Sequence, residues 1–299
     1  MLAPITLFVY NRPFHTRKTL ESLEKNTLAK ESELFVFADG PKENASKEQL
    51  EKIIETRKII QERNWCGKVH IFEKEKNVGL AKSVIAGVSE IIDKYGKIIV
   101  LEDDLLLSVN FLQYMNDGLD KYEKEEKVMQ IAGYMYPVDI KIDNDAFFLP
   151  FTTSWGWATW KRVWDNFDKN DNGLEKLEND RKLRYKFNLD GSYPYYKMLK
   201  NQVEKDIDSW AIRFYLTIFM RNGLVLFPRR TLVNNIGMDG SGVHCKIAIK
   251  QDIIIDNFSV KNFDDIAVRS EAKKEVYAFL KKQMNIIIRG VRFIRQILK

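Results

Sequence analysis

The sequence has few cysteines and no long apolar run. Two cysteines, Cys66 and Cys245, occur in 299 residues, and they supply neither a disulfide framework nor the spacing of a cysteine-ligated metal site. No stretch approaches the ~20 apolar residues of a membrane-spanning helix. Residues 1–10 contain no positive charge and have the pattern of a strand, not of a signal peptide. We therefore expect a cytoplasmic protein with reduced thiols.

Excess positive charge is absent from most of the chain. The formal net charge is +6, but residues 276–299 contain six basic residues and no acidic one. Without these six, the 48 basic residues become 42 and equal the 42 acidic residues. A neutral body lacks the basic surface that nucleic acids require, so the sequence predicts no nucleic-acid partner.

Strand and helix patterns alternate over the first hundred residues. Short apolar segments bounded by turn residues, typical of strands, lie at residues 4–10, 34–38, 69–72 and 97–101. Helical patterns fill the intervals, at residues 13–26, 47–63 and 77–94. This order predicts an α/β fold with a Rossmann-like, doubly wound and mostly parallel sheet. No G-x-G-x-x-G motif follows a strand, which argues against a dinucleotide-binding domain.

The fourth of these strands is followed directly by three acidic residues, Glu102, Asp103 and Asp104. Because the carboxyl ends of parallel strands meet at one edge of the sheet, residues 10–12, 39–40 and 73–77 should lie near them. Carboxylates at that edge can hold a divalent cation, and the cation can hold a diphosphate. The alternative interpretation is a solvated acidic turn.

Aromatic residues are concentrated after the acids. Residues 150–168 contain four tryptophans, at positions 155, 157, 160 and 164. Sugar rings present flat C–H faces that pack on aromatic rings, while the indole N–H donates a hydrogen bond. The segment therefore indicates carbohydrate binding, and a tryptophan-rich core is the alternative. The preceding residues 139–146 are polar and are expected to form a loop.

Two further segments carry polar groups that could act on a ligand. Asp206 and Asp208 precede Trp210 and an apolar helical stretch. Asp208 is either the N-cap of that helix or a general base that removes a proton from a hydroxyl. Glycines at positions 237, 240 and 242 precede His244, and a glycine-rich loop can close over a ligand. His15, in the first helix, is expected to be structural or exposed.

Taken in chain order, these segments resemble the inverting GT-A glycosyltransferases, in particular the N-acetylglucosaminyltransferase I type and the bacterial family-2-like sugar transferases. The similar segments, spread over residues 4–245, are Tyr10-Asn11-Arg12, Asp39, Val100-Leu101-Glu102-Asp103-Asp104-Leu105, Gly156-Trp157, Asp208-Ser209-Trp210 and Gly242-Val243-His244. Ser209 departs from the pattern because it separates Asp208 from Trp210, which leaves Asp206 as an alternative base. The segment Gly242-Val243-His244 lacks the serine that stands between valine and histidine in the family. The last 50 residues have no counterpart.

The resemblance implies sugar transfer from a UDP-sugar to a hydroxyl, with inversion and with Mn²⁺ or Mg²⁺ as cofactor. Asp104 would bind the metal, Glu102 and Asp103 would hold ribose or donor-sugar hydroxyls, and Asp208 would activate the acceptor. The residues implied on the nucleotide side are Asn11, Arg12, Asp39, Asn77 and Lys82. The residues implied beside the donor sugar and the acceptor are Trp155, Gly156, Trp157, Trp210 and His244. The acceptor would be a glycan or lipid-linked glycan of bacterial surface polysaccharide synthesis.

The catalytic domain is expected to span residues 1–250, with a nucleotide-sugar half at 1–107 and an α+β acceptor half at 108–250. Residues 251–299 form an extension with a basic amphipathic helix over 276–299. Its apolar stripe consists of Leu280, Met284, Ile287, Val291, Ile294 and Leu298. Such a helix binds anionic membrane surfaces, which would place the enzyme on the inner face of the cytoplasmic membrane. A helix docked on the catalytic domain and a coiled-coil seam are the alternatives.

Two other functions fit parts of the pattern. A sugar nucleotidyltransferase also uses a nucleotide crevice and a metal, but that class usually has a glycine-rich loop after its first strand, where this chain has Asn11-Arg12-Pro13. A catalytically silent carbohydrate-binding or membrane-associated protein would not need intact acids at positions 102–104 and 208. Binding of UDP with and without Mn²⁺ separates the three functions.

Overall fold

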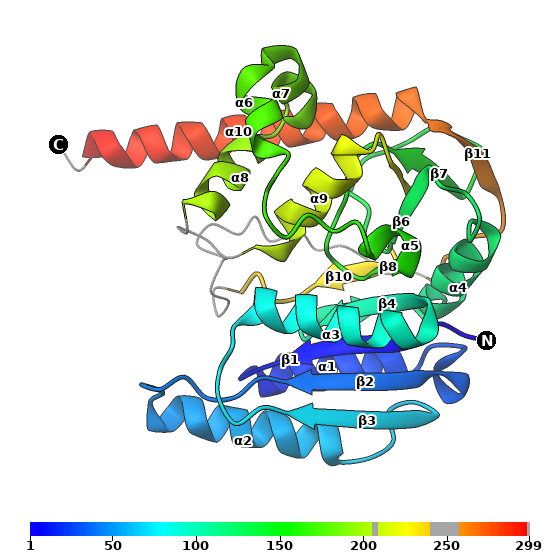
Figure 1. Ribbon diagram of the computed structural model, residues 1–299, viewed down its shortest axis with the longest axis vertical. Coiled ribbons are helices and arrows are strands. Elements are labelled where there is room, and N and C mark those ends of the chain that lie inside the picture. The colour runs from blue at the N-terminus through cyan, green and yellow to red at the C-terminus, as the bar shows by residue number, and fades with distance from the viewer. Residues whose placement is uncertain (205–208, 240–256, 298–299) are drawn as a thin grey trace.

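The computed structural model describes residues 1–204, 209–239 and 257–297, with 287–297 as helix backbone only. Within these residues nine strands form one sheet in the order β11-β7-β9-β6-β8-β4-β1-β2-β3 (Figure 1). The strands are β1 (Ile5–Val9), β2 (Glu33–Ala38), β3 (Lys68–Glu73), β4 (Lys97–Glu102), β6 (Val128–Ala132), β7 (Ala146–Leu149), β8 (Trp157–Trp160), β9 (Leu224–Pro228) and β11 (Phe263–Val268). A two-stranded sheet pairs β5 (Leu105–Leu107) with β10 (Val233–Asn235).

The large sheet is parallel in its N-terminal half. Strand β1 pairs in parallel with β2 and with β4, and β2 pairs in parallel with β3. The connections contain α1 (Pro13–Glu24), α2 (Lys47–Gln61) and α3 (Leu80–Tyr95). All of β1 and the centre of β4 are buried, as expected for strands covered on both faces, and this explains their continuous apolar runs. The predicted α/β fold with a mostly parallel sheet is confirmed.

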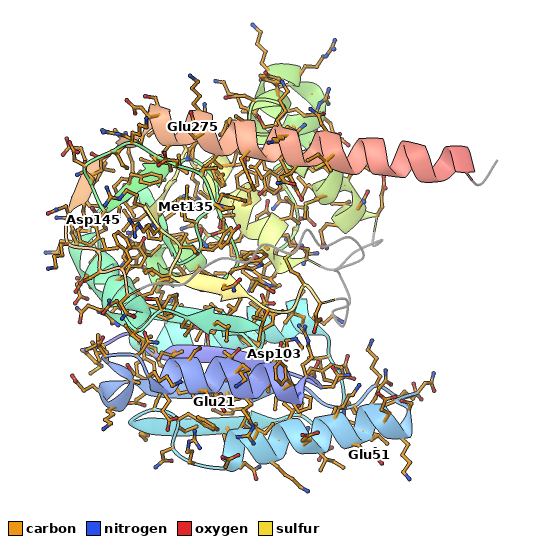
Figure 2. All side chains as sticks on the ribbon, turned by 180° about the vertical axis from the view of Figure 1, so that it is seen from behind. Glu21, Glu51, Asp103, Met135, Asp145 and Glu275 are labelled. Atoms are coloured by element: carbon orange, nitrogen blue, oxygen red, sulfur yellow. The ribbon has the colours of Figure 1, made fainter. Side chains whose placement is uncertain are left out.

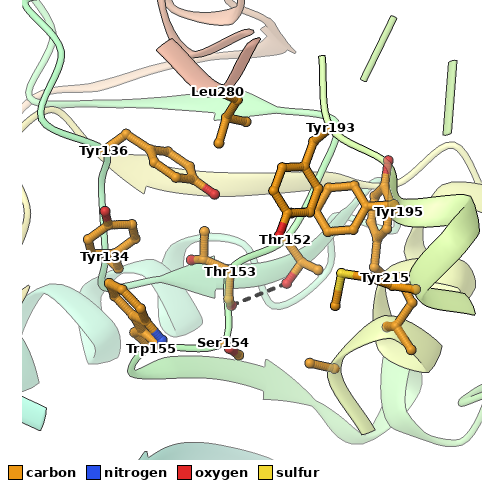
Figure 3. A pocket seen from close by; sticks show the side chains of 13 residues that line it. Tyr134, Tyr136, Thr152, Thr153, Ser154, Trp155, Tyr193, Tyr195, Tyr215 and Leu280 are labelled. Carbon is orange, nitrogen blue, oxygen red and sulfur yellow. Dashed lines mark hydrogen bonds between the residues drawn. The ribbon is translucent and has the colours of Figure 1, made fainter. Parts of the chain in front are cut away.

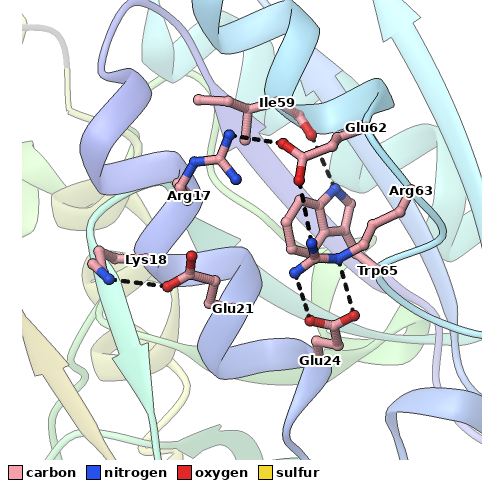
Figure 4. Close-up of polar contacts among 8 residues, drawn as sticks. All are labelled: Arg17, Lys18, Glu21, Glu24, Ile59, Glu62, Arg63 and Trp65. Atoms are coloured by element: carbon pink, nitrogen blue, oxygen red, sulfur yellow. Dashed lines mark hydrogen bonds and ion pairs between the residues drawn. The ribbon is translucent and has the colours of Figure 1, made fainter.

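Ion pairs join α1 to the residues that directly follow α2 (Figure 4). Arg17 lies 2.7 Å from Glu62, and Arg63 lies 2.9 Å from Glu24. The Arg63 guanidinium also lies 4.0 Å above the centre of the Trp65 ring. Because exposed ion pairs contribute only ~0–1 kcal/mol each, the buried apolar side chains beneath the two helices contribute most of the stability. These contacts fix α1, which starts directly after Arg12.

Antiparallel strands join the two halves of the molecule. Strand β8 lies between β4 and β6 and is antiparallel to both, so Trp157 pairs with Val100 on one side and with Ala132 on the other. Strand β7 begins at Ala146, the last residue of the expected loop, and is antiparallel to β9. Both β7 and β8 are fully buried, so their sequences lack the alternation that signals a strand. The helices of this half are α4 (Phe111–Lys121), α5 (Lys161–Trp164), α6 (Leu174–Asn179), α7 (Arg181–Phe187), α8 (Tyr195–Val203) and α9 (Trp210–Met220).

The C-terminal segment is attached to the same sheet. Strand β11 pairs in parallel with β7 at the sheet edge, so the expected extension adds a strand to the central sheet. Helix α10 (Ser270–Ile297) begins before the expected residue 276, and its Val276 and Leu280 are buried. The first turns of the apolar stripe therefore face the protein, while later turns of α10 extend past α6, α7 and α8 (Figure 1). None of the helices in the described ranges is long and apolar enough to cross a membrane.

Candidate active site

The carboxyl ends of β1, β2 and β4 bring three predicted site segments together. Arg12 follows β1, Asp39 follows β2, and the acids at 102–104 end β4. The register of the sheet pairs Phe8 of β1 with Glu102 of β4. Asp103 is labelled in Figure 2, next to helix α1. This convergence is the one that parallel neighbouring strands predict.

Arg12 contacts two of the acidic residues directly. Its Nη1 atom lies 2.8 Å from Asp104 Oδ2 and 3.9 Å from Asp103 Oδ1. Its Nη2 atom donates to the carbonyl oxygen of Gly237 at 3.2 Å. The charged side chains are only 12–15% exposed, so solvent screens their attraction less than that of a surface pair. Asn11, the preceding residue, is half-buried at the same edge.

Burial raises the pKa values of all three acids, and the charges of neighbouring acids add to the rise for Glu102 and Asp103. Burial, with the charges of Asp104 and Asp103, raises the pKa of Glu102 to about 8. Burial and the charge of Asp104 raise the pKa of Asp103 to about 7, against the opposing effect of Arg12. Burial also raises the pKa of Asp104, and Arg12 opposes this rise through its charge and its hydrogen bond. Carboxylates that resist ionisation together in this way favour an additional cation.

A segment from the second half of the chain covers Asp104. At the end of β10, Asn235 Nδ2 lies 3.4 Å from Asp104 Oδ1, and farther along the chain Asp239 Oδ2 lies 3.0 Å from His15 Nε2. A methyl group on Gly237 would lie 2.0 Å from Asp104 Oδ2, so a larger residue there would displace the Asp104 carboxylate. The sequence predicted no ligand-side role for His15, which nevertheless lies beside the acids. The sequence contains the Gly237-Met238-Asp239 stretch, but it does not show that Asp239 lies next to His15.

Asp39 holds the turn in front of α3. Its carboxylate accepts hydrogen bonds from the backbone N–H groups of Gly40 (2.9 Å) and Gly79 (3.0 Å). Asn77 Nδ2 donates to the carbonyl oxygen of Gly40 at 3.0 Å. Asp39 and Asn77, both predicted on the nucleotide side, are thus brought together by contacts within the protein. Lys82 is exposed on the first turn of α3, at the same end of the helix.

The buried tryptophans form a stack that ends at Glu102. The Trp210 indole N–H favours the charged form of Glu102 and so opposes the rise of its pKa. Trp157 stacks on Trp210 with ring centroids 5.0 Å apart. Trp157 has no exposed surface, so the direct sugar contact predicted for it is not supported by the structure. These two rings instead support Glu102 from the protein interior.

Gly156 and Trp155 differ from each other in exposure. Gly156 has a φ of +63°, and a methyl group there would lie 3.0 Å from Phe111 and from Val233, so this glycine shapes the turn into β8. Trp155 is half-buried and packs edge to face on Tyr134, with ring centroids 4.4 Å apart. Of the predicted Trp155-Gly156-Trp157 segment, Trp155 therefore keeps an accessible ring.

Three predicted site residues, Asp206, Asp208 and His244, lie outside the described residues. Their roles stay predictions. The structure does assign the N-cap position of α9 to Ser209, one residue after Asp208. Both roles considered for Asp208, general base and helix cap, stay predictions.

The acids have the chemistry of a site for Mn²⁺ or Mg²⁺. Such ions prefer oxygen ligands, and Mg²⁺ is commonly held by one or two carboxylates together with substrate phosphates and water. Asp103 and Asp104 already converge on one cationic atom, Nη1 of Arg12. In the described part of the chain, no group of three or more His, Cys, Asp or Glu side chains is arranged to hold a metal. The donor set therefore fits an ion that shares its coordination with a bound diphosphate.

Comparisons with known proteins agree with this chemistry at the level of the family. The chain matches the model of glycosyl transferase family 2 over residues 5–184. No curated protein matches the sequence. A mannosyltransferase from Pyrobaculum calidifontis, in complex with GDP-Man and Mn²⁺, is similar at 10% identity and a TM-score of 0.38, covering 58% of this chain and 51% of that one. Residues 1–349 of S. aureus TarS are similar at 12% identity and a TM-score of 0.43, covering 78% of this chain and 60% of that one.

This chain thus spans about half to three-fifths of the length of those two structures. The family match begins at β1 and extends beyond β8, so it includes the four parallel strands, the acids at 102–104 and the tryptophan segment. The mostly parallel α/β sheet and the polar groups at its carboxyl edge are consistent with that match. The chain belongs to glycosyl transferase family 2.

Proposed function

We propose that this glycosyltransferase moves a sugar from a UDP-sugar to a hydroxyl of a glycan or lipid-linked acceptor, with inversion at the anomeric carbon. The observation that carries the proposal is the convergence of Arg12, Asp39 and the acids at 102–104 on one edge of a parallel sheet. Ligands of open α/β sheets bind at this edge. Family membership supports the sugar transfer itself.

Mn²⁺ or Mg²⁺ fits the proposal as an ion held by Asp104, with Asp103 beside it. When bound, the ion supplies positive charge that neutralises the departing diphosphate. Arg12 now lies 2.8 Å from Asp104. A donor phosphate beside an ion on Asp104 would therefore lie within reach of the guanidinium. Arginine binds phosphate through paired N–H groups. Glu102, supported by the Trp210 indole, would orient hydroxyls of the ribose or the donor sugar.

The acceptor hydroxyl must lose a proton as its oxygen attacks the anomeric carbon. In this proposal Asp208 takes that proton, and Asp206 is the alternative base. Both residues precede Trp210, which contacts Glu102, so the chain returns to the acids close to this point. Attack on the face opposite the diphosphate would invert the anomeric carbon.

The C-terminal helix fits an acceptor that is attached to a membrane. Its first turns dock on the body through Val276 and Leu280. Its later turns extend past the body in Figure 1 and include Arg289, Arg292 and Arg295. We propose that these turns bind anionic lipid on the inner face of the cytoplasmic membrane.

Vesicle sedimentation tests the membrane role. The full chain should sediment with anionic vesicles at low salt and less so at high salt, because salt screens basic contacts. A chain ending at residue 286 keeps the docked turns, so it should stay in the supernatant and still bind UDP. Equal sedimentation of both forms would contradict the proposed role of the later turns.

A donor screen tests the proposed reaction. Nucleotide release from UDP-, GDP- and CMP-sugars should depend on added Mn²⁺ or Mg²⁺ and should be fastest with a UDP-sugar. Faster release from a GDP- or CMP-sugar would contradict the donor assignment while leaving sugar transfer in place. Release of pyrophosphate from a nucleoside triphosphate and a sugar phosphate would instead show nucleotidyl transfer.

A further inference from the structure

A pocket of about 290 Å³ lies in the acceptor half of the protein (Figure 3). Its wall includes five tyrosines, at positions 134, 136, 193, 195 and 215, and we refer to it as the tyrosine pocket. Helix α10 contributes Leu280 to the wall. Ligand pockets commonly have volumes of ~300–1,000 Å³, so this pocket is suited to one sugar-sized ring and not to a long oligosaccharide.

One buried hydroxyl in the wall has no hydrogen-bond partner in the described structure. Thr153 is 9% exposed, and its Oγ1 atom is without a partner. The adjacent Thr152 hydroxyl donates to the Gln130 side chain, and Gln130 Nε2 donates to the Thr153 carbonyl oxygen at 3.1 Å. The backbone around Thr153 is therefore fixed. The hydroxyl of Thr153 is therefore available to a ligand, because buried polar groups in proteins are rarely left without a hydrogen-bond partner.

The remaining walls combine aromatic faces with hydroxyl groups. Trp155 and Tyr134 stand together on one side of the pocket, and Tyr193 and Tyr195 stand on the other (Figure 3). The ring centroids of Tyr193 and Tyr195 lie 4.6 Å apart, and the hydroxyl groups of Tyr136, Tyr193 and Tyr195 belong to the same pocket wall. A pyranose ring matches such walls, because its C–H faces pack on aromatic rings and its hydroxyls bind polar groups. A hydrocarbon chain would leave Thr153 without a partner.

Two short stretches of chain connect the tyrosine pocket with the active site. Trp155 lies two residues before Trp157, which pairs with Val100 of β4. Ala211 lines the pocket and directly follows Trp210, whose indole contacts Glu102. A ligand in the pocket therefore lies on the tryptophan side of Glu102, away from the turn that Asp39 holds in the nucleotide half.

We propose that the tyrosine pocket binds one pyranose ring of the acceptor. The hydroxyl of Thr153 is a hydrogen-bond partner of that ring, and Leu280 makes α10 part of the acceptor site. This assignment rests on the proposed function, since it names the class of ligand that reaches the sugar donor. It gives the docked turns of α10 a role in substrate binding that is separate from membrane attachment by the later turns.

Saturation-transfer NMR with simple glycosides tests this proposal. The probes are the methyl α- and β-pyranosides of glucose, galactose, mannose and N-acetylglucosamine, with hexanol as the hydrocarbon probe. Leu280→Trp fills the pocket, and Ile286→Trp places the same ring at an exposed site on the same helix as the control. We expect at least one glycoside to bind the wild type and Ile286→Trp equally and Leu280→Trp about tenfold more weakly, a loss of about 1.4 kcal/mol.

Thr153→Val is a second variant that removes the hydroxyl with little change in volume. It should weaken glycoside binding by about tenfold. Thr56→Val, at a buried threonine of α2, is its control and should have no effect on glycoside binding. A Thr153→Val protein that melts at a higher temperature and binds glycosides as the wild type does would show that the hydroxyl is only an unsatisfied structural group, and this result would overturn the proposal.

UDP titration of the same samples separates this proposal from the proposed function. Glycoside binding that is lost in Leu280→Trp while UDP binding is retained supports the pocket. Absence of glycoside binding in a protein that binds UDP, equal binding by Leu280→Trp, or binding of hexanol alone overturns it. Glycoside binding that depends on the pocket in a protein that binds no nucleotide supports the pocket and contradicts the donor assignment.

Discussion

Arg12 Nη1 lies 2.8 Å from Asp104 Oδ2, so the carboxylate proposed to bind a metal already has a positive partner. The two residues meet because the strands that precede them, β1 and β4, are parallel neighbours. In the proposed function, a metal ion and the guanidinium would act on the same carboxylate. They would compete without a nucleotide, and a bound nucleotide would offer the guanidinium a phosphate partner.

Replacing Arg12 by Met should strengthen the binding of Mn²⁺ alone and weaken the binding of UDP. Loss of the guanidinium removes a positive charge that competes with the ion for Asp104, but it also removes a phosphate partner. We expect Mn²⁺ affinity to rise about threefold and UDP affinity in the presence of Mn²⁺ to fall about tenfold. Titration calorimetry measures both. Arg17→Met, in α1 and paired with Glu62, is the control, and a fall in both affinities would contradict the competition.

The raised pKa values predict how stability and metal binding depend on pH. The pKa of Glu102 is about 8 and that of Asp103 about 7, above the ~4 of unfolded carboxyl groups. Since the folded state holds these protons more tightly, the metal-free protein should gain stability as the pH falls from about 8 toward about 5. Mn²⁺ needs ionised acids, so it should raise the melting temperature more at about pH 8.5 than at about pH 6.

Thermal unfolding with and without Mn²⁺ checks both parts of this prediction. The double variant Glu102→Gln, Asp103→Asn should lose most of the pH dependence, because it removes the two carboxyl groups with the highest pKa values. An increase in melting temperature by Mn²⁺ that is equal at both pH values would show that the ion does not bind at these acids.

Replacing Trp210 by Phe should lower turnover more than stability. The ring keeps its stacking on Trp157, but Glu102 loses the indole N–H that supports its charged form. We expect kcat to fall about tenfold. Trp164→Phe is the control, because Trp164 is also buried and donates its indole N–H to Ser89, away from the acids. Equal loss of turnover in the two variants would point to a general packing effect.

Replacing Asp208 by Asn should remove the proposed base. The variant keeps the shape of the side chain but cannot take a proton, so we expect turnover to fall about 10²-fold or more with UDP affinity nearly unchanged. Asp206→Asn provides the comparison two positions away. If Asp206→Asn shows the loss and Asp208→Asn does not, the base is Asp206; normal turnover in both variants would contradict an aspartate base in this segment.

The carboxyl edge of β1, β2 and β4 could be predicted from sequence because its signals are local in the chain. Each strand, turn and helix of residues 1–104 carries its own signal, and parallel pairing then fixes which ends meet. Arg12, Asp39 and the acids at 102–104 follow directly from this order. The sequence predicted the position of Asp39 but not its contacts. Its carboxylate accepts hydrogen bonds from the backbone N–H groups of Gly40 and Gly79.

The acceptor half could not be predicted to the same degree because its contacts are distant in sequence. Trp157 lies between β4 and β6, so its ring is buried by strands on both sides, whereas the sequence showed only a tryptophan-rich segment. Strand β10 pairs with β5 more than a hundred residues earlier, and this pairing brings Gly237 onto Asp104. Leu280 likewise belongs to an apolar stripe that could face lipid or protein, and only the packing of α10 decides between them.

Titration of UDP with and without Mn²⁺, into wild type and Asp104→Asn, tests the proposed metal-dependent donor site most directly. Asp104 lies at the carboxyl edge of the sheet and not in the apolar core, so the variant should fold. Its melting curve will show whether it does. We predict that Mn²⁺ strengthens UDP binding by about tenfold or more in the wild type and has little effect in Asp104→Asn. An equal gain in both proteins, or no gain in the wild type, would contradict a metal-assisted nucleotide site at Asp104.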